Sequence, residues 1–433
     1  MSADENPAIL PHIVVLGAGF AGLTFCQRFP SSLARITLID RQNHHLFQPL
    51  LYQVATAGLA APDIAQPARA ILAKKPNLTV LMAEVVGFDL AGKRLQLDYG
   101  ELSYDYLVIG LGGVTSYFGH NEWEAHAPGL KSLDDALRIR RDILLAFERA
   151  ETERDEARHR ELLTTVVIGG GPTGVELAGA FSELARTVLR CDFNHVDPTQ
   201  ARVVLVEGAE RILLQFPPHL AAKARQQLEA LGVEVRTATK VQDLQANEIV
   251  FADGTRLRAG NIIWAAGVAA NPVATKLGVE LDRANRIKIL PDCSLPGYPE
   301  VFAVGDIATL VDKNGRTVPG VSPAAMQMAG HAVKIIVDEQ REGRVDPAKR
   351  PAFAYWDKGS MATIGRSKAV AMVGKFTFSG YIAWLAWLGV HLLFLVGFRN
   401  RFSVLSQWMY SYFTYKRGAR IITGLSGPPR PLV

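Results

Sequence analysis

Two glycine-rich hexapeptides have the residue types and spacing best suited to chemistry in this chain. Glycines at these intervals let a backbone turn approach a pyrophosphate closely, and a following helix directs its free N–H groups at the negative charge. Each hexapeptide therefore predicts a phosphate-binding turn. The two turns are Gly17-Ala18-Gly19-Phe20-Ala21-Gly22 and Gly169-Gly170-Gly171-Pro172-Thr173-Gly174.

An acidic residue follows each turn, at the end of the next apolar run. Asp40 ends the run 35–39, and Glu207 ends the run 203–206 after a longer spacing, because residues 191–200 insert a loop. A carboxylate at this place hydrogen-bonds ribose hydroxyls and repels a 2′-phosphate. The sequence thus predicts two dinucleotide sites, the second preferring NADH to NADPH. The alternative is two ordinary tight turns of an α/β sheet.

The elements that must position these residues begin twice in the order strand, turn, helix. A strand over 13–16 and a helix to 29 flank the first turn, whereas a strand over 164–168 and a helix over 175–189 flank the second. The charged, helically periodic residues 133–160 predict a solvated connecting helix. We predict an α/β fold with two Rossmann-type dinucleotide-binding domains and a C-terminal helical tail.

A late strand over 301–304 runs into Gly305-Asp306, with a helix expected over 323–338. We expect this segment to return to the first domain, where Asp306 accepts a ribityl hydroxyl; the alternative is a helix-capping aspartate. The predicted organisation is a flavin-binding domain in two parts (1–130 and 286–345), a connecting helix (131–160), an NADH-binding domain (161–285) and a C-terminal β-rich and helical segment (346–433).

The three cysteines are far apart in the sequence, and no pair has CxxC spacing. We expect a reducing compartment, no disulfide framework and no metal site. The N-terminus begins with acids where an export signal would have bases, so no export signal is expected.

The last 76 residues differ in character from the rest of the chain. None of the 42 acidic residues lies after Asp357, whereas ten of the 47 basic residues do. Residues 376–398 carry no formal charge, and aromatic residues recur at 384, 387, 391, 394 and 398 on one helical face. Three alternatives remain: a helix lying in the plane of a membrane surface, a transmembrane span, and a buried dimer core. No nucleic-acid recognition module accompanies the bases.

The chain resembles the type II NADH:quinone oxidoreductases, which are single-subunit, non-pumping dehydrogenases of the two-dinucleotide-binding flavoproteins. The resemblance rests on VVLGAGFAGL, HHLFQPLLYQVATAGL, YDYLVIGLGG, VVIGGGPTGVELAG, IIWAAGV, VFAVGDIA, VPGVSPAAMQMAGHA and DKGSMATIGR. It implies FAD at the first turn and NADH at the second. For FAD it implies contacts from Gly17, Gly19, Gly22, Asp40, Leu111, Gly112, Gly305, Asp306 and Ala325; for NADH, from Gly169, Gly171, Gly174, Glu207, Gly267 and Val268.

The resemblance also implies two catalytic residues. Glu176 is expected beside the nicotinamide and the flavin, where it handles a proton; the alternative is an acid stabilised by the helix dipole. The family's Ala-Gln-x-Ala-x-x-Gln run is Ser322 to Gln327 here, so Pro323 replaces the first Gln. Quinone placement is therefore expected to depend on Gln327, backbone groups and apolar walls.

We therefore expect an enzyme that oxidises NADH through FAD and reduces a membrane quinone without pumping ions. The resemblance implies a monotopic respiratory homodimer at the lipid surface of the cytoplasmic face of the plasma membrane. A sulfide:quinone or other flavin reductase is an alternative, but it requires cysteines in the flavin-contact motifs, and none stands there. A membrane-bound NADH-binding sensor is the other alternative, and Pro323 favours it.

Overall fold

The computed structural model describes residues 10–414 and 417–424, which form two compact units. The first unit contains the residues up to His45, 66–114 and 268–358, and the second contains 46–65, 115–267 and those from 359 onward. The return to the first unit thus begins at 268 instead of 286, and residues 46–65 group with the second. At four of the places where the chain passes from one unit to the other, it forms a short strand. These strands are β3 (His44–Leu46), β4 (Ala65–Pro67), β10 (Gly113–Thr115) and β18 (Val268–Ala270).

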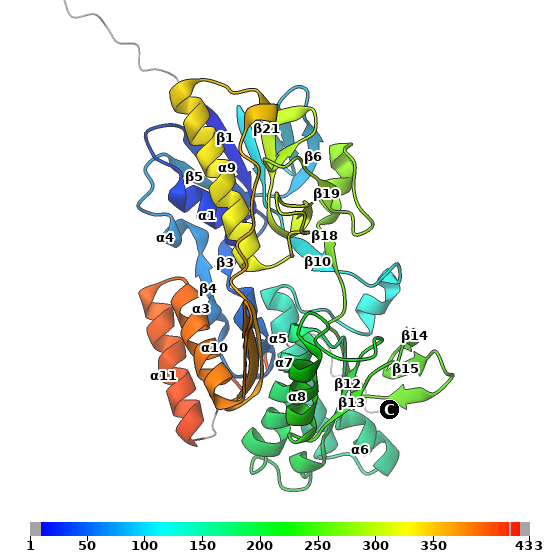
Figure 1. Cartoon of the computed structure of the whole chain (residues 1–433). Helices are drawn as coiled ribbons and strands as arrows, with labels where there is room; N and C mark the ends of the chain where they lie inside the picture. The colour runs from blue at the N-terminus through cyan, green and yellow to red at the C-terminus, as the bar shows by residue number, and fades with distance from the viewer. Residues whose placement is uncertain (1–9, 415–416, 425–433) are drawn as a thin grey trace, which may run out of the picture. The chain divides into compact units, whose positions relative to one another are not determined.

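A six-stranded sheet forms the core of the first unit. Its two central strands, 12–16 and 106–109, are fully buried and rich in Val, Ile and Leu, as expected for a parallel sheet covered on both faces, and only the edge strand β20 is antiparallel. Helices α1 (Phe20–Arg28) and α9 (Ser322–Glu342) pack against each other beside it (Figure 1). The order is β20 (Ser294–Leu295), β21 (Tyr298–Ala303), β9 (Tyr106–Ile109), β1 (His12–Leu16), β2 (Arg35–Asp40), β5 (Leu78–Met82).

Smaller elements complete the first unit. An antiparallel sheet contains β6 (Val85–Asp89), β7 (Arg94–Leu97) and β8 (Gly100–Ser103), and the remainder are α4 (Ala68–Ile71), β19 (Ile287–Lys288) and β22 (Ala308–Thr309).

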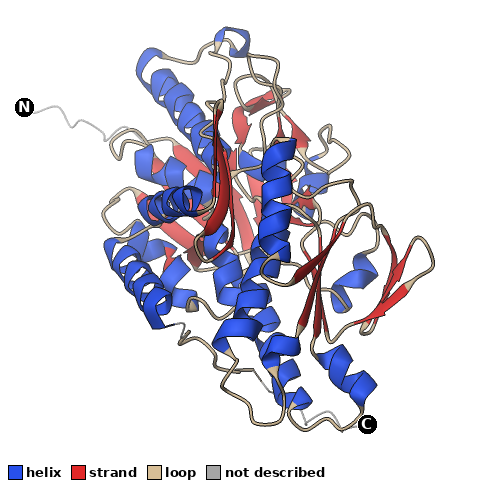
Figure 2. Cartoon of the chain, turned by 60° about the horizontal axis from the view of Figure 1, so that its bottom comes forward, coloured by secondary structure: helices blue, strands red, loops and turns tan. Residues whose placement is uncertain are grey.

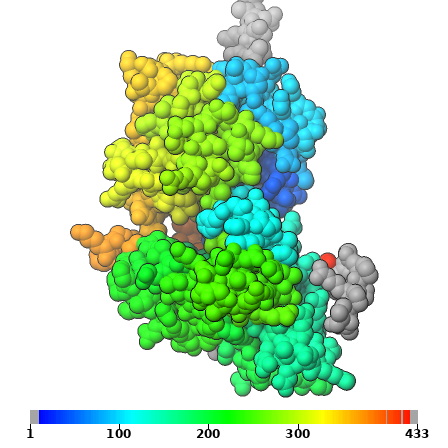
Figure 3. All heavy atoms as spheres, turned by 90° about the vertical axis from the view of Figure 1, so that its right-hand side faces the viewer, coloured from blue at the N-terminus to red at the C-terminus, as the bar shows by residue number. Residues whose placement is uncertain are grey.

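A four-stranded parallel sheet forms the core of the second unit, in the order β13 (Val233–Arg236), β12 (Arg202–Val206), β11 (Thr164–Ile168), β17 (Asn261–Trp264). Figure 2 distinguishes the helices (blue) from the strands (red) of the chain. Residues 115–125 belong to this unit and lie beside its later residues (cyan next to green in Figure 3), and Tyr117 and Trp123 pack with Trp264 in its core. The antiparallel strands are β14 (Val241–Gln245), β15 (Glu248–Phe251) and β16 (Arg256–Arg258), and the helices of this part are α7 (Pro172–Glu183) and α8 (Pro218–Glu229).

The expected solvated connecting helix is wrong in two respects. It is two helices, α5 (Leu133–Ala150) and α6 (Glu156–Leu162), and α5 buries a full apolar face that includes Ile139, Ile143 and Phe147. Ser132 and Asp135 form a capping box at its start. The many charges of α5 occupy its other face, so net polarity concealed the amphipathic pattern.

The C-terminal segment joins the second unit through a three-stranded sheet. Strand β23 (Ser360–Gly365) packs on α7 so closely that a Cβ on Gly179 would lie 1.7 Å from the carbonyl oxygen of Ile364. Strands β24 (Lys368–Val373) and β25 (Phe376–Ser379) follow, and helices α10 (Tyr381–Phe394) and α11 (Phe398–Thr414) then lie side by side (Figure 1). None of the described helices has both the length and the apolar character needed to cross a bilayer.

Candidate active site

The glycines of the first turn occupy three different environments. Gly17 has φ +95°, and a Cβ there would lie 2.4 Å from the carbonyl oxygen of Gly110. A Cβ on Gly22 would lie 1.9 Å from the carbonyl oxygen of Gly17, whereas a Cβ on Gly19 would meet nothing within 4 Å. The outer glycines are therefore required by protein packing. The middle glycine faces open space at the N-terminus of α1, where a pyrophosphate would approach.

Asp40 closes this turn. One of its carboxylate oxygens accepts the N–H of Ala18 at 2.6 Å, and the other accepts the N–H of Gln42 at 2.7 Å. Each oxygen retains a lone pair, so the carboxylate can fix the turn and still accept a ribose hydroxyl.

The second turn repeats this construction. A Cβ on Gly174 would lie 1.8 Å from the carbonyl oxygen of Gly169, and a Cβ on Gly171 would meet nothing within 4 Å. Glu207 accepts the N–H of Gly170 at 2.6 Å and that of Ala209 at 2.8 Å. The longer sequence spacing leaves Glu207 immediately after β12, where the parallel register sets it beside the turn. Both turns fit a dinucleotide pyrophosphate.

The other predicted FAD residues lie in the first unit. A Cβ on Gly305 would be 3.1 Å from the Cβ of Ala325 and 3.9 Å from that of Ala21, so the starts of α9 and α1 meet beside Gly305. Asp306 is partly exposed in a 3₁₀ turn between β21 and β22. Leu111 and Gly112 follow the end of β9, next to β1 in the sheet.

Gly267 and Val268 follow strand β17. A Cβ on Gly267 would lie 2.7 Å from the ring of Phe118, and the Val268 side chain is exposed. Gly267 is therefore required by packing, whereas Val268 is available to a ligand.

Glu176 lies on the second turn of α7 and is only partly exposed. Burial raises the pKa of its carboxyl to about 8, and a hydrogen bond from the backbone of Thr363 acts in the opposite direction and lowers it. The backbone N–H of Thr363 donates to Oε1 of Glu176 at 3.4 Å. Glu176 therefore holds a proton at neutral pH and is able to exchange it.

Gln327 clamps a neighbouring segment of the first unit. Its Nε2 donates to the carbonyl of Trp356 at 3.0 Å, and its Oε1 accepts the N–H of Trp356 at 3.0 Å. One N–H and one oxygen lone pair of the Gln327 amide remain available to hydrogen-bond a bound molecule. Pro323 lies in the first turn of α9, where a missing N–H costs no helical hydrogen bond, so the fold tolerates it.

Sequence reasoning assigned no role to Tyr52 and Gln53 on α2 (Leu51–Ala55), although they lie in a motif that supports the family resemblance. Trp408 on α11 donates its indole N–H to Oε1 of Gln53 at 2.8 Å, and Nε2 of Gln53 donates to the hydroxyl of Tyr52 at 2.9 Å. Only this hydrogen bond to α11, more than 350 residues away along the chain, indicates that the short helix α2 has a structural role.

Helix α11 docks through polar side chains, the reverse of an ordinary amphipathic helix. Asp63, at the end of α3 (Ala61–Ile64), accepts hydrogen bonds from Ser403 and Gln407 of α11 at 2.8 Å each. The inward face of α11 is thus largely polar. Both helices also expose large apolar and aromatic side chains, and these are Tyr381, Ile382, Leu385, Val390, Leu393, Phe394, Phe402, Leu405, Met409, Tyr410 and Phe413.

The aromatic stripe identified in the sequence of α10 faces mainly inward. Trp387 is 2% exposed and stacks on His391 at 4.2 Å, and burial lowers the pKa of His391 to about 4. The aromatic spacing therefore marked a face that packs on the protein at Trp387, whereas Phe394 is exposed together with the aliphatic residues between the rings.

The cysteines are not arranged for redox chemistry. Cys26 and Cys293 are buried, and burial raises the pKa of the Cys26 thiol to about 12 and that of Cys293 above its usual range. Cys191 is exposed. Buried thiols with raised pKa values are poor nucleophiles.

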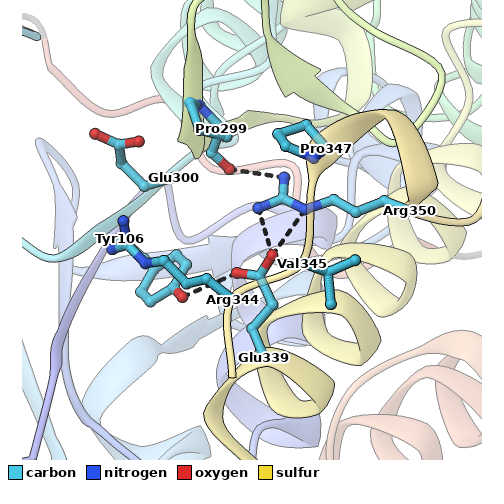
Figure 4. Close-up of a pocket in the computed structure, with 8 residues that line it drawn as sticks. All are labelled: Tyr106, Pro299, Glu300, Glu339, Arg344, Val345, Pro347 and Arg350. Carbon is cyan, nitrogen blue, oxygen red and sulfur yellow. Dashed lines mark hydrogen bonds and ion pairs between the residues drawn. The ribbon is translucent and has the colours of Figure 1, made fainter. Parts of the chain in front are cut away.

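A small hollow in the first unit is lined by charged, aromatic and apolar residues, and an ion pair joins two of them, Arg350 and Glu339 (Figure 4). The buried Arg350 binds Asp292 at 3.0 Å and Glu339 at 2.6 Å, and Glu339 also accepts the hydroxyl of Tyr106. This network links the end of α9 to the sheet.

The chain matches the family described as pyridine nucleotide-disulphide oxidoreductase over residues 11–329 and the NDH2 C-terminal domain over residues 357–416. It is 42% identical to the type II NADH:quinone oxidoreductase Ndh of Mycobacterium tuberculosis, over 98% of this chain and 93% of that one. It is 28% identical to a mitochondrial internal alternative NAD(P)H-ubiquinone oxidoreductase of Arabidopsis thaliana, over 93% of this chain and 84% of that one.

Among solved structures, NDH2 from Plasmodium falciparum in complex with NADH superimposes with a TM-score of 0.85 at 20% identity, covering 96% of this chain and all of that one. The predicted α/β fold is therefore confirmed, as are the FAD cofactor and the NADH and quinone substrates. The chain belongs to the type II NADH:quinone oxidoreductases, FAD-dependent enzymes within the pyridine nucleotide-disulphide oxidoreductase family.

Proposed function

We propose that this NADH:quinone oxidoreductase holds FAD at the turn of the first unit and NADH at the turn of the second, and works at a membrane surface. The two glycine turns, each closed by a carboxylate and each open at its middle glycine, carry the proposal. When bound, FAD supplies a ring that accepts a hydride and passes two electrons on.

The binding residues divide by unit. In the first, the N–H groups at the start of α1 bind the pyrophosphate, while Asp40 and Asp306 accept hydroxyls of FAD. In the second, the start of α7 binds the pyrophosphate of NADH, and Glu207 accepts its ribose hydroxyls and repels a 2′-phosphate.

Glu176 handles the proton that the reaction requires. NADH, one proton and a quinone give NAD⁺ and a quinol, so each turnover consumes one proton from solvent. With its pKa near 8, Glu176 holds that proton at neutral pH and regains it from water after release. In the first unit, Gln327 offers its remaining N–H to the quinone carbonyl.

The outward faces of α10 and α11 bind the lipid surface. They combine exposed apolar side chains with a segment rich in Lys and Arg, which suits an anionic interface. We place the enzyme peripherally on the cytoplasmic face of the plasma membrane, where both NADH and quinone are available. A homodimer would use part of the same apolar surface.

Stopped-flow absorbance tests the redox function. We expect rapid bleaching of the flavin by NADH and rapid recovery of its colour with a soluble quinone. Bleaching without recovery would indicate a sensor, and bleaching by sulfide but not by NADH would indicate the rival reductase. A colourless protein that takes up no added FAD would refute the proposal.

A further inference from the structure

Phe118 is an exposed aromatic residue in a strained backbone conformation. Its φ is +53°, in the left-handed region that a bulky residue rarely adopts. Its side chain is 68% exposed. Such strain costs folding free energy, and an apolar ring left in water returns none of it. Strained residues of this kind gather at sites that hold a ligand, so the surroundings of Phe118 indicate which ligand it would contact.

The Phe118 ring is fixed on the residues that follow β17. The N–H of Ser116 donates to the carbonyl of Gly267 at 3.3 Å, and the indole of Trp264 donates to the carbonyl of Ser116 at 2.8 Å. The ring of Phe118 meets that of Trp264 edge to face, with centroids 6.3 Å apart. A Cβ on Gly267 would lie 2.7 Å from the Phe118 ring. The position of the exposed ring is therefore set by several contacts from the end of β17.

The end of β17 lies beside the second glycine turn. Strands β17 and β11 are parallel neighbours, and the N–H of Ala265 donates to the carbonyl of Ile168 at 2.7 Å. A Cβ on Gly169, the first residue of the turn, would lie 2.7 Å from the carbonyl of Ala265. The turn, the end of β17 and the Phe118 ring thus share the carboxyl edge of the sheet, where parallel α/β sheets bind their ligands.

The strand order decides which half of NADH would reach Phe118. Strand β11 leads into the turn proposed for the pyrophosphate, and it lies between β12 and β17. Glu207 follows β12 and is proposed to accept the adenosine ribose, so the adenosine half extends toward β12. The two halves of a dinucleotide leave the pyrophosphate in opposite directions across the point where the strand order reverses. The nicotinamide half therefore extends toward β17, where Phe118 lies.

We propose that Phe118 binds NADH by packing against its nicotinamide half. The inference rests on the NADH site proposed at the second turn. An aromatic ring offers a flat apolar face to the planar nicotinamide. Because the backbone already holds this ring in place, little conformational entropy is lost when the substrate binds. Glu207 and Phe118 would then hold NADH at its two ends.

Binding of NADH and of ADP-ribose, which lacks the nicotinamide, tests this inference in the full-length, FAD-loaded enzyme. The concentration dependence of flavin reduction gives the dissociation constant of NADH, and competition gives that of ADP-ribose. Phe118→Ala should raise the constant for NADH about tenfold and leave that for ADP-ribose unchanged. Gly171→Ala should raise both, because its methyl enters the pyrophosphate space that the two ligands share. Phe376→Ala removes an exposed ring elsewhere in the same unit and should change neither.

Phe118→Gly separates binding from folding, because glycine adopts a positive φ without strain. It should bind NADH as weakly as Phe118→Ala but melt at a higher temperature. Unchanged NADH binding in both variants, or an equal loss of ADP-ribose binding, would overturn the inference. If the unsubstituted enzyme shows no bleaching of its flavin by NADH, the proposed function itself fails.

Discussion

At the scale of single residues, the two turns separate glycines that the fold needs from glycines that a ligand needs. The outer glycines touch backbone oxygens, so a methyl group there would collide with the protein itself. The middle glycines, Gly19 and Gly171, face open space and have ordinary backbone angles. Alanine at an outer glycine should therefore disturb folding, whereas alanine at a middle glycine should disturb nucleotide binding.

The first prediction concerns which turn binds which nucleotide. Gly19→Ala should weaken FAD retention at least about tenfold, whereas Gly171→Ala should retain FAD and raise KM for NADH about tenfold, because each methyl enters one pyrophosphate space. Gly22→Ala is the contrasting variant and should lower the free energy of unfolding by about 1–3 kcal/mol. Flavin absorbance, steady-state kinetics and denaturation measure these effects. If Gly19→Ala instead raised KM for NADH and Gly171→Ala weakened FAD retention, each nucleotide would be assigned to the opposite turn.

The second prediction concerns discrimination against NADPH. Glu207→Gln removes the repulsion of a 2′-phosphate and keeps one acceptor oxygen for the N–H groups of Gly170 and Ala209, which the two oxygens of Glu207 accept. The ratio of kcat/KM for NADH to that for NADPH should fall about tenfold. Glu210→Gln removes an equal charge from an exposed position in the same loop and should leave the ratio unchanged. Equal ratios in both variants would remove Glu207 from the ribose site.

At the scale of elements, helix α11 docks through polar contacts, helix α10 docks through Ala383 and Trp387, and both leave apolar residues exposed. Asn400 donates to the carbonyl of Pro62, and Ser403 and Gln407 bind Asp63, so α11 is fixed by directional bonds. Exposed apolar area of this kind favours transfer to a lipid surface by about 25 cal/mol per Å² buried.

The third prediction tests this outward face. The double variant Phe402→Ser, Met409→Ser should lower the affinity of the protein for phospholipid vesicles at least tenfold, with soluble NADH oxidation preserved. Met82→Ser is a suitable control, because Met82 is comparably exposed but lies in the first unit. Vesicle co-sedimentation measures the affinity. Unchanged binding of the double variant would place the membrane contact elsewhere.

At the scale of the whole molecule, charge is divided unevenly along the chain. The net charge of +5 results from ten bases after Asp357 without a compensating acid, while the preceding part has more acids than bases. Such a tail attracts anionic lipid, and this attraction is screened within about 10 Å at 0.1 M salt.

The fourth prediction follows from that charge distribution. At low ionic strength the protein should bind vesicles with an anionic lipid more tightly than neutral vesicles, and about 1 M salt should remove the difference while apolar binding remains. The neutral vesicles serve as the control for the apolar contribution. Equal binding to both at low salt would show that the tail bases do not face the lipid.

The sequence by itself determined the two turns, the acids that close them and the α/β fold around them. These features depend on local spacing, since a glycine turn between a strand and a helix needs only neighbouring residues. The tertiary structure alone decided the hydrogen bond that Glu176 accepts, because Thr363 comes from a segment more than 100 residues away along the chain. It also decided that the aromatic stripe of α10 faces inward, because periodicity identifies a helical face but not what covers it.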